Sequence, residues 1–322
     1  MGLREAGDAN QATLAMGRIA RHPVWSRALG RPEVAARLVL PVIVSGAVED
    51  RERVDGTAGL ERLSITELVR EARGAASAGL AGLLIFGASD RKDELALLAS
   101  QRDHVVPRAV RAVKEAVPEL AVVTDVCVCA YVSHGQCVLF GAGGADVAGT
   151  LERLAEIAQV HADAGADLLI PSGMLDGAAA AVRAALGPDH DDLPIAAMAE
   201  IESSLDATHR LVVGAVPISE RAVPLLSADD QVAVGMRARR ELEGGADAIV
   251  IRPGAPALDL VQVVASRTDR PVFAFHTADE HAAFAMSELI DGARAEREIV
   301  AASRRAGAAF VITYAARGIA EA

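Results

Sequence analysis

Short apolar runs alternate with stretches of helical periodicity along most of the chain. Each run is brief, rich in β-branched residues and apolar on both faces, which is typical of parallel strands that are covered on both sides. The pattern therefore predicts eight buried strands. They cover residues 38–44, 83–86, 122–128, 167–171, 195–201, 248–252, 272–276 and 310–314.

The segments between these runs carry helix signals. Residues 64–73 begin with Ser64 and have Glu67 three positions later, which is the spacing of a capping box. Residues 150–165 repeat leucine and isoleucine at helical intervals and end at Gly165. Both segments are predicted to be amphipathic helices.

One helix-to-strand link recurs three times. The sequence A-G-A-D-L-L-I at 164–170 returns as G-G-A-D-A-I-V-I at 244–251 and as A-G-A-A-F-V-I at 306–312. In each copy a glycine ends a helical pattern and an apolar run follows almost at once. The repetition indicates one βα unit used several times.

Eight strands with intervening helices favour an α/β fold, a (β/α)8 TIM barrel. An open doubly wound sheet is the alternative, but no G-x-G-x-x-G follows the first run. Residues 1–36 precede the first strand and are predicted to form an N-terminal arm. Residues 37–322 are predicted to form the catalytic barrel.

Composition narrows the choice of partners. The 322 residues are 52% hydrophobic and carry a net charge of −12, which argues against nucleic acid or an anionic membrane surface. No stretch is apolar and uncharged for long enough to span a bilayer, and the N-terminus lacks the apolar core of a signal peptide. We therefore expect a cytoplasmic protein without a membrane partner.

All three cysteines lie in one short segment, T-D-V-C-V-C-A-Y-V-S-H-G-Q-C at 124–137. Thiolates suit Zn²⁺, and three protein ligands leave a fourth position open, as in catalytic zinc sites. The segment follows the third predicted strand, at the barrel end where active sites lie. Cys127, Cys129 and Cys137 are therefore candidate zinc ligands; three buried apolar cysteines are the alternative, and His134 is a possible fourth ligand.

This segment resembles the zinc segment of the porphobilinogen synthase (5-aminolevulinate dehydratase) family, T-D-V-C-L-C-x-Y-x-S-H-G-H-C. Further collinear matches are F-G-A-S-D-R-K-D-E (86–94), P-S-G-M-L-D-G (171–177), G-A-D-A-I-V-I-R-P (245–253) and F-V-I-T-Y (310–314). The resemblance implies a TIM barrel with an arm that embraces a neighbouring subunit, a homo-oligomer between dimer and octamer, and a small-molecule substrate.

The resemblance fails at two positions that matter for catalysis. Family members join two 5-aminolevulinates, and two lysines at adjacent strand ends hold the substrate ketones, at least one of them as a Schiff base. The alignment puts Arg252 and Ile201 at these places. Neither side chain can form a Schiff base, because guanidinium keeps its proton and isoleucine has no nucleophile. Lys92 is an alternative amine, and Lys114 is the one other lysine in the chain.

The candidate catalytic residues lie at predicted strand ends. Asp125 is a candidate general base, or else it holds the zinc loop. Arg252 is a candidate clamp for a carboxylate, or else a salt-bridged arginine of an altered pocket. Tyr314 is a candidate donor to an oxyanion or carboxylate, and His281 is the preferred acid–base histidine over His276.

The resemblance also implies substrate contacts from Ser172, from the position of Ile201, and from Arg210 and Arg221, which lie near the family's carboxylate-binding arginines. The favoured function is a zinc-dependent lyase or cyclase that acts on a small amino-ketone or carboxylated carbonyl compound without a Schiff base, in specialised biosynthesis. The alternatives are a non-catalytic zinc- or ligand-binding paralogue, and porphobilinogen formation by an unusual route.

Overall fold

Eight parallel strands form the centre of the molecule. The computed structural model describes residues 17–57 and 59–322. The strands pair in the order β8, β5, β4, β1, β12, β11, β10, β9, and a bridge between Leu169 and Ile195 joins the two ends of this series. The predicted (β/α)8 TIM barrel is confirmed. Its strands are β1 (Leu38–Ser45), β4 (Gly82–Ala88), β5 (Ala121–Val126), β8 (Leu168–Pro171), β9 (Ala196–Glu200), β10 (Ala248–Arg252), β11 (Val272–Phe275) and β12 (Phe310–Ile312).

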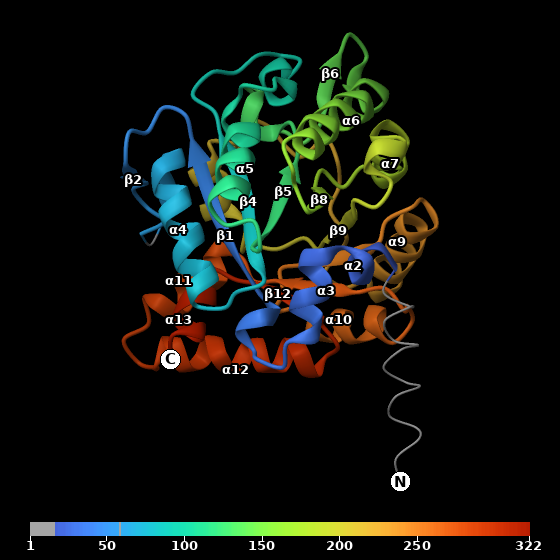
Figure 1. Cartoon of the computed structure of the whole chain (residues 1–322). Coiled ribbons are helices and arrows are strands. Elements are labelled where there is room, and N and C mark those ends of the chain that lie inside the picture. Colours follow the sequence, from blue (N-terminus) through green and yellow to red (C-terminus); the bar gives the residue numbers. More distant parts are fainter. Residues whose placement is uncertain (1–16, 58) are drawn as a thin grey trace.

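Helices surround this barrel (Figure 1). Short strands β2 (Arg51–Arg53), β3 (Glu61–Leu63), β6 (Leu139–Gly141) and β7 (Gly144–Asp146) lie outside the ring. The helices are α4 (Ile65–Ser77), α5 (Val105–Ala116), α6 (Val147–Asp163), α7 (Ala178–Leu186), α8 (Ala207–Val213), α9 (Gln231–Glu243), α10 (Leu258–Ala265), α11 (Ala278–Ala285), α12 (Gly292–Arg305) and α13 (Ala316–Ala320), with short 3-10 turns that include η3 (Cys129–Tyr131).

The predicted helix starts and turns follow the expected chemistry. The side chain of Ser64 accepts a hydrogen bond from the backbone N–H of Glu67 and caps α4. The three repeated helix-to-strand links place Gly165, Gly245 and Gly307 at φ of +99°, +104° and +107°. Only glycine adopts such angles without strain, so these links are built alike.

The N-terminal end of the barrel is closed by α2 (Gly17–Arg21) and α3 (Pro23–Gly30). Trp25 is fully buried, lies edge-on to Phe273 and Phe310 at centroid distances of 5.9 and 5.0 Å, and donates its Nε1–H to the Asp167 carbonyl. Residues 17–30 thus pack on their own barrel (Figure 1). The rest of the predicted arm, residues 1–16, lies outside the described residues.

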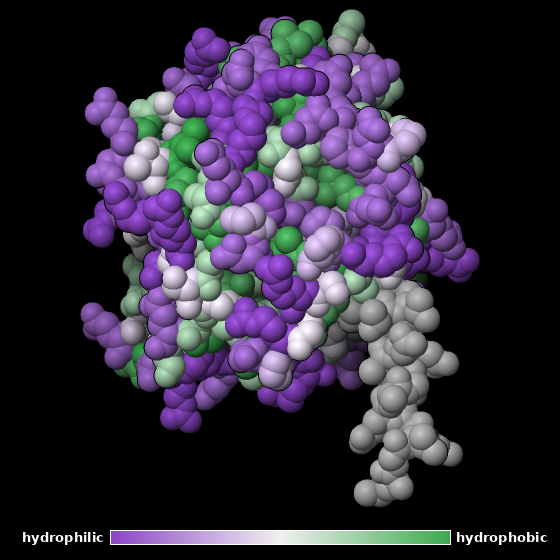
Figure 2. All heavy atoms as spheres, viewed as in Figure 1, coloured by the Kyte–Doolittle hydropathy of each residue, from purple (hydrophilic) through white to green (hydrophobic). Residues whose placement is uncertain are grey.

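The surface is mostly hydrophilic (Figure 2), as expected for a chain with 24% charged residues. Hydrophilic residues cover most of the face seen in Figure 2, and apolar side chains show mainly between them. Among the described residues, no helix combines the length and the hydrophobicity needed to cross a membrane. The opposite, C-terminal end of the barrel carries the candidate site.

Candidate active site: a thiol cluster beside a buried charge network

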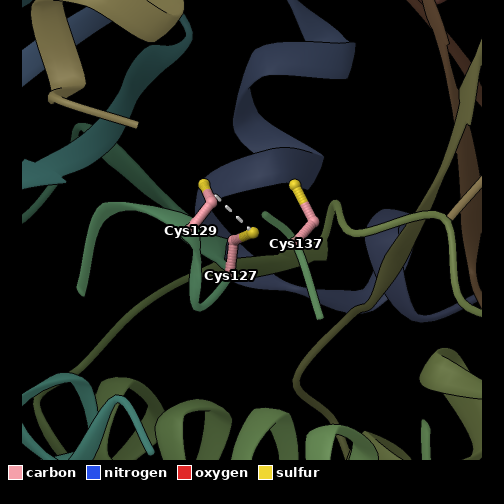
Figure 3. Close-up of side chains that lie close together, drawn as sticks. All are labelled: Cys127, Cys129 and Cys137. Atoms are coloured by element: carbon pink, nitrogen blue, oxygen red, sulfur yellow. Dashed lines mark hydrogen bonds between the residues drawn. The ribbon is translucent and has the colours of Figure 1, made fainter. Parts of the chain in front are cut away.

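The three cysteines converge at the end of β5. Cys127 follows the strand directly, Cys129 opens the turn η3, and Cys137 returns from the loop before β6. Their sulfur atoms all lie within 4.8 Å of one another, and those of Cys127 and Cys129 are 3.4 Å apart (Figure 3). Three thiols at this spacing suit a single soft or borderline metal ion.

Two glycines let the cysteine loop fit into this place. Gly135 has a φ of +65°, and a Cβ there would lie 2.5 Å from the Val216 carbonyl oxygen. A Cβ on Gly173 would lie 3.0 Å from the carbonyl oxygen of Cys137. The loop is therefore held between the end of β8 and the segment that follows α8.

The electrostatics favour one thiolate in the cluster. Hydrogen bonds from Cys127 and Cys129, together with Arg210 and Arg221, hold the pKa of Cys137 well below its ordinary value. A metal ligand must be deprotonated, so this environment assists binding.

His134 does not belong to the group of thiols. Its Nδ1 accepts the backbone N–H of Gln136, and its ring lies edge-on to Phe140. The structure thus brings the three predicted cysteine ligands together without the histidine that the sequence left as a fourth candidate.

A charge network lies across the barrel mouth from the thiols. The register of β9 and β10 sets Glu200 directly opposite Arg252. Nη1 of Arg252 donates to Glu200 at 3.2 Å, Nη2 donates to Asp206, and the guanidinium lies over the ring of Phe275. Burial raises the pKa of Glu200, which Arg252 opposes.

Asp206 is the centre of this network. Besides Arg252, it accepts hydrogen bonds from Nε of Arg210 at 2.5 Å and from Nη2 of Arg221 at 2.6 Å. Burial acts to raise the pKa of Asp206, but Arg252 and Arg210 hold it well below its ordinary value. Three guanidinium groups thus share one carboxylate.

A small cavity separates the thiols from the charge network. Its volume is about 30 Å³, and its lining includes Asp125, Cys129, Cys137, Ser172, Glu200 and Arg252. A neighbouring cavity of about 10 Å³ adds Gln136 and Arg221. Burial raises the pKa of Asp125 to about 7, although a hydrogen bond with Ser172 acts to lower it. Thiol, acidic and cationic groups therefore face one space.

Some predicted residues lie elsewhere. Met198 and Glu200 line the cavity, so alternation along the chain turns Ile201 away, and Ile201 packs in the hydrophobic core. His281 is paired through Nδ1 with Glu296. Neither Ile201 nor His281 lines the cavity beside the thiols.

Tyr314 also lies outside the residues that line this space. Its ring stacks on that of His281 at a centroid distance of 6.2 Å. Its hydroxyl is buried and has no hydrogen-bond partner within residues 17–57 and 59–322. His276, at the end of β11, bonds through Nε2 to the hydroxyl of Ser303.

The two lysines are committed to other contacts. Nζ of Lys92 donates to the carbonyl oxygen of Gly214 at the end of α8. Lys114 pairs with Asp167 at the opposite end of the barrel. Neither lysine is among the residues that line the cavity.

His209 also lines the larger cavity. Sequence reasoning missed it together with three other polar residues of the site: Glu200, Asp206 and Gln136. Glu200 could have been found, because a strand-end acid beside Arg252 lies on the face that the strand's alternation assigns to the barrel interior. Asp206 and His209 belong to the segment after β9. The sequence gives no signal of which side chains of this segment face the cavity, or of which acid pairs with which arginine. Gln136 departs from the histidine of the resembling motif.

Comparisons with known proteins agree with this site. The family model for delta-aminolevulinic acid dehydratase matches residues 16–322. The chain belongs to the delta-aminolevulinic acid dehydratase family. The Escherichia coli K12 member is 31% identical over 88% of this chain and 89% of its own length, and the Methanothermobacter thermautotrophicus member is 35% identical over 86% and 87%.

A solved family structure has the same architecture. The Toxoplasma gondii enzyme, in complex with its reaction product porphobilinogen, superposes with a TM-score of 0.86 at 26% identity and covers 94% of this chain and 90% of its own. This chain is therefore an enzyme of the family, a lyase. Enzymes of this family act on small molecules, are generally metal-dependent and are generally oligomeric.

Proposed function

We propose that this protein is a zinc-dependent lyase that condenses, dehydrates or cyclises a small amino-ketone or carboxylated carbonyl compound without a Schiff base. The observation that carries the proposal is Arg252. It stands in V-I-R-P, at the strand end where the family pattern has a lysine, and it is buried in ion pairs with Glu200 and Asp206. A guanidinium in this setting keeps its proton and cannot capture a ketone.

Cys127, Cys129 and Cys137 would hold the ion. A bound Zn²⁺ with one open position supplies a Lewis acid that polarises a carbonyl or binds an amine. Side chains of the cavity wall would handle the protons. Asp125 and Glu200 line the cavity and would hold or move a proton there, and Ser172 lies beside Asp125.

Borohydride trapping tests the proposal. The purified protein, loaded with zinc, is incubated with 5-aminolevulinate and with other small ketoacids, reduced, and analysed by mass spectrometry. We expect no covalent adduct. An adduct on Lys92 would overturn the mechanism, because Lys92 would then supply the amine of a Schiff base. Lys92 is the lysine to examine first, since it lies close enough to Cys129 for their charges to interact.

Ordinary porphobilinogen formation is the second candidate, and the family relatives favour it. A colorimetric assay for porphobilinogen with 5-aminolevulinate separates the two. Product formation at a rate typical of an enzyme, roughly 1 s⁻¹ or faster, would support this second candidate.

We extend the proposal to the assembly. The family is generally oligomeric, so we expect a homo-oligomer between dimer and octamer, with residues 1–36 contributing to the subunit contacts. Light scattering after size-exclusion chromatography measures the subunit number. A variant that lacks residues 1–16 should form a smaller assembly.

A further inference from the structure

Three arginines from different places in the chain meet on a carboxylate that the chain itself supplies. Arg252 comes from the end of β10, Arg210 lies in α8, and Arg221 lies in the segment beyond α8. All three donate to Asp206. Such convergence of guanidinium groups is the usual way in which proteins bind a carboxylate ligand.

The side chain of Asp206 bonds to the arginines and not to the backbone N–H groups at the start of its helix. Asp206 is the N-cap residue of α8, where an aspartate ordinarily accepts hydrogen bonds from the first backbone N–H groups. Here it makes no side-chain capping bond. Its carboxylate is turned toward the arginines instead, from a segment that covers the barrel mouth.

Three guanidinium groups surround the carboxylates of this network, and the thiol of Cys137 also lies near Arg210 and Arg221. Three guanidiniums face two carboxylates, those of Asp206 and Glu200, since Arg221 also lies 3.9 Å from Glu200. Nε of Arg252 is buried and has no hydrogen-bond partner in the described part of the chain. A buried donor without a partner is costly, so Arg252 can donate a hydrogen bond to one more acceptor.

The space at the barrel mouth is too small for a substrate while Asp206 is in place. The cavities of about 30 and 10 Å³ have room for a few water molecules at most. The segment that carries Asp206 is also tied to the barrel by Thr208, whose hydroxyl donates to Asp279, and by Arg62, whose Nε donates to the Val212 carbonyl. A substrate can enter only when part of this segment moves.

The family resemblance already implies that Arg210 and Arg221 bind a substrate carboxylate. We propose that Asp206 is an internal occupant of this site, held there by Arg252 as well, and that the carboxylate of a small keto or amino acid displaces it on binding. The ligand class is thus a small organic acid whose carboxylate takes the place of the Asp206 side chain. The inference rests on the proposed function in placing this site at the reaction centre. It adds a residue that selects for anionic substrates and closes the site in their absence.

Binding of a simple carboxylate to the full-length protein tests the inference. Propionate is titrated by isothermal calorimetry into wild type, Asp206→Asn, Asp206→Ala and the control Asp229→Ala, whose aspartate is exposed. Both Asp206 variants should bind propionate at least about tenfold more tightly than wild type and the control. Propionamide, which has the same shape but no charge, should bind to none of them.

A second variant and a second measurement test whether the tighter binding of propionate comes from displacement of Asp206. Adding Arg221→Ala to Asp206→Asn should abolish the gain, and saturating wild type with propionate should speed hydrogen exchange in residues 202–226. Equal propionate affinity in wild type and Asp206→Asn, or a gain that survives the loss of Arg221, would overturn the inference. Unchanged exchange in residues 202–226 would do the same, since Asp206 would then stay in place.

The test is separate from that of the proposed function because it needs no turnover. A trapped Schiff base together with tighter propionate binding would remove the proposed function and leave the displacement of Asp206 standing. If no Schiff base is trapped and propionate binding is not tighter, the proposed function stands and only the inference about Asp206 is removed. If Asp206→Ala does not fold, Asp206→Asn keeps the shape of the side chain and carries the test.

Discussion

The thiol segment at 124–137 and the strand ends at Glu200 and Arg252 face one cavity, yet they relate differently to the family pattern. The thiol segment keeps all three cysteines at the family spacing, and its sulfurs converge. The strand ends carry the ion pair between Arg252 and Glu200, at the place where the resemblance puts the family's lysines. Under the proposed function, this difference means that metal binding and covalent capture of a ketone are separable parts of one barrel mouth.

Replacement of a thiol should give the largest effect and tests the first region. Cys127→Ser removes a soft ligand, and we expect zinc affinity to fall by more than the 10- to 100-fold that is lost when only an outer partner of a ligand is removed. Metal content after dialysis against graded chelator measures it. Ser133→Ala, an exposed change in the same loop, is the control. Unaltered zinc affinity in Cys127→Ser would show that the thiols are not the metal site.

Truncation of Arg252 should give the largest loss of stability in the second region. Arg252→Ala leaves Glu200 buried with only Arg221 at 3.9 Å, while Asp206 keeps Arg210 and Arg221, so the free energy of unfolding should fall by about 3–5 kcal/mol. Urea unfolding measures it. Arg53→Ala, which removes an exposed ion pair with Glu61, should cost less than about 1 kcal/mol.

Restoring a lysine sharpens this comparison. In Arg252→Lys the two carboxylates would stabilise the ammonium and keep it protonated, so borohydride trapping with ketones should stay negative. A trapped adduct in this variant would show that a single substitution separates the chain from Schiff-base chemistry. It would also mean that Glu200 and Asp206 do not govern the charge at this strand end.

The two regions also differ in how far the sequence predicts them. All eight strands and the converging cysteines follow from local signals: buried β-branched runs, glycines at helix ends, and soft ligands clustered after one strand. The sequence places Trp25 in the predicted N-terminal arm, because nothing in residues 17–30 indicates a contact with Phe273 and Phe310. That contact depends on the closed barrel.

The charge network was not predictable in the same way. A shift of one residue along a strand reverses the face, so aligning Ile201 with a lysine hides Glu200, which points to the cavity. Asp206 meets three arginines that are far apart in sequence, and only the folded segment after β9 decides which acid they share. Nonlocal ion pairs of this kind require the tertiary structure.

Acid should destabilise the strand-end region through buried histidine. Burial lowers the pKa of His276 to about 4, whereas an unfolded histidine titrates near 6.5. The unfolded state therefore binds more protons between these values, and stability falls as pH drops from about 6.5 toward 4, by at most about 3 kcal/mol for this group. In His276→Gln the loss of unfolding free energy between pH 7 and 4.5 should be smaller. Equal losses in both proteins would contradict a neutral His276.

The smallest expected effect concerns Gln136, which links the thiol segment to the segment that follows α8. Its side-chain amide donates to the carbonyl oxygens of Ser219 and Glu220 at 3.2 and 2.8 Å, and its Oε1 accepts from the backbone N–H of Ala222. Gln136→Ala should loosen residues 215–226 by about 1–2 kcal/mol, which is roughly a 5- to 30-fold increase in local opening. Hydrogen exchange measures this, with Ser133→Ala as the control. If the regions are separable, zinc affinity stays at the wild-type value; a parallel loss of zinc would show that the segment covering the mouth and the thiol loop act as one unit.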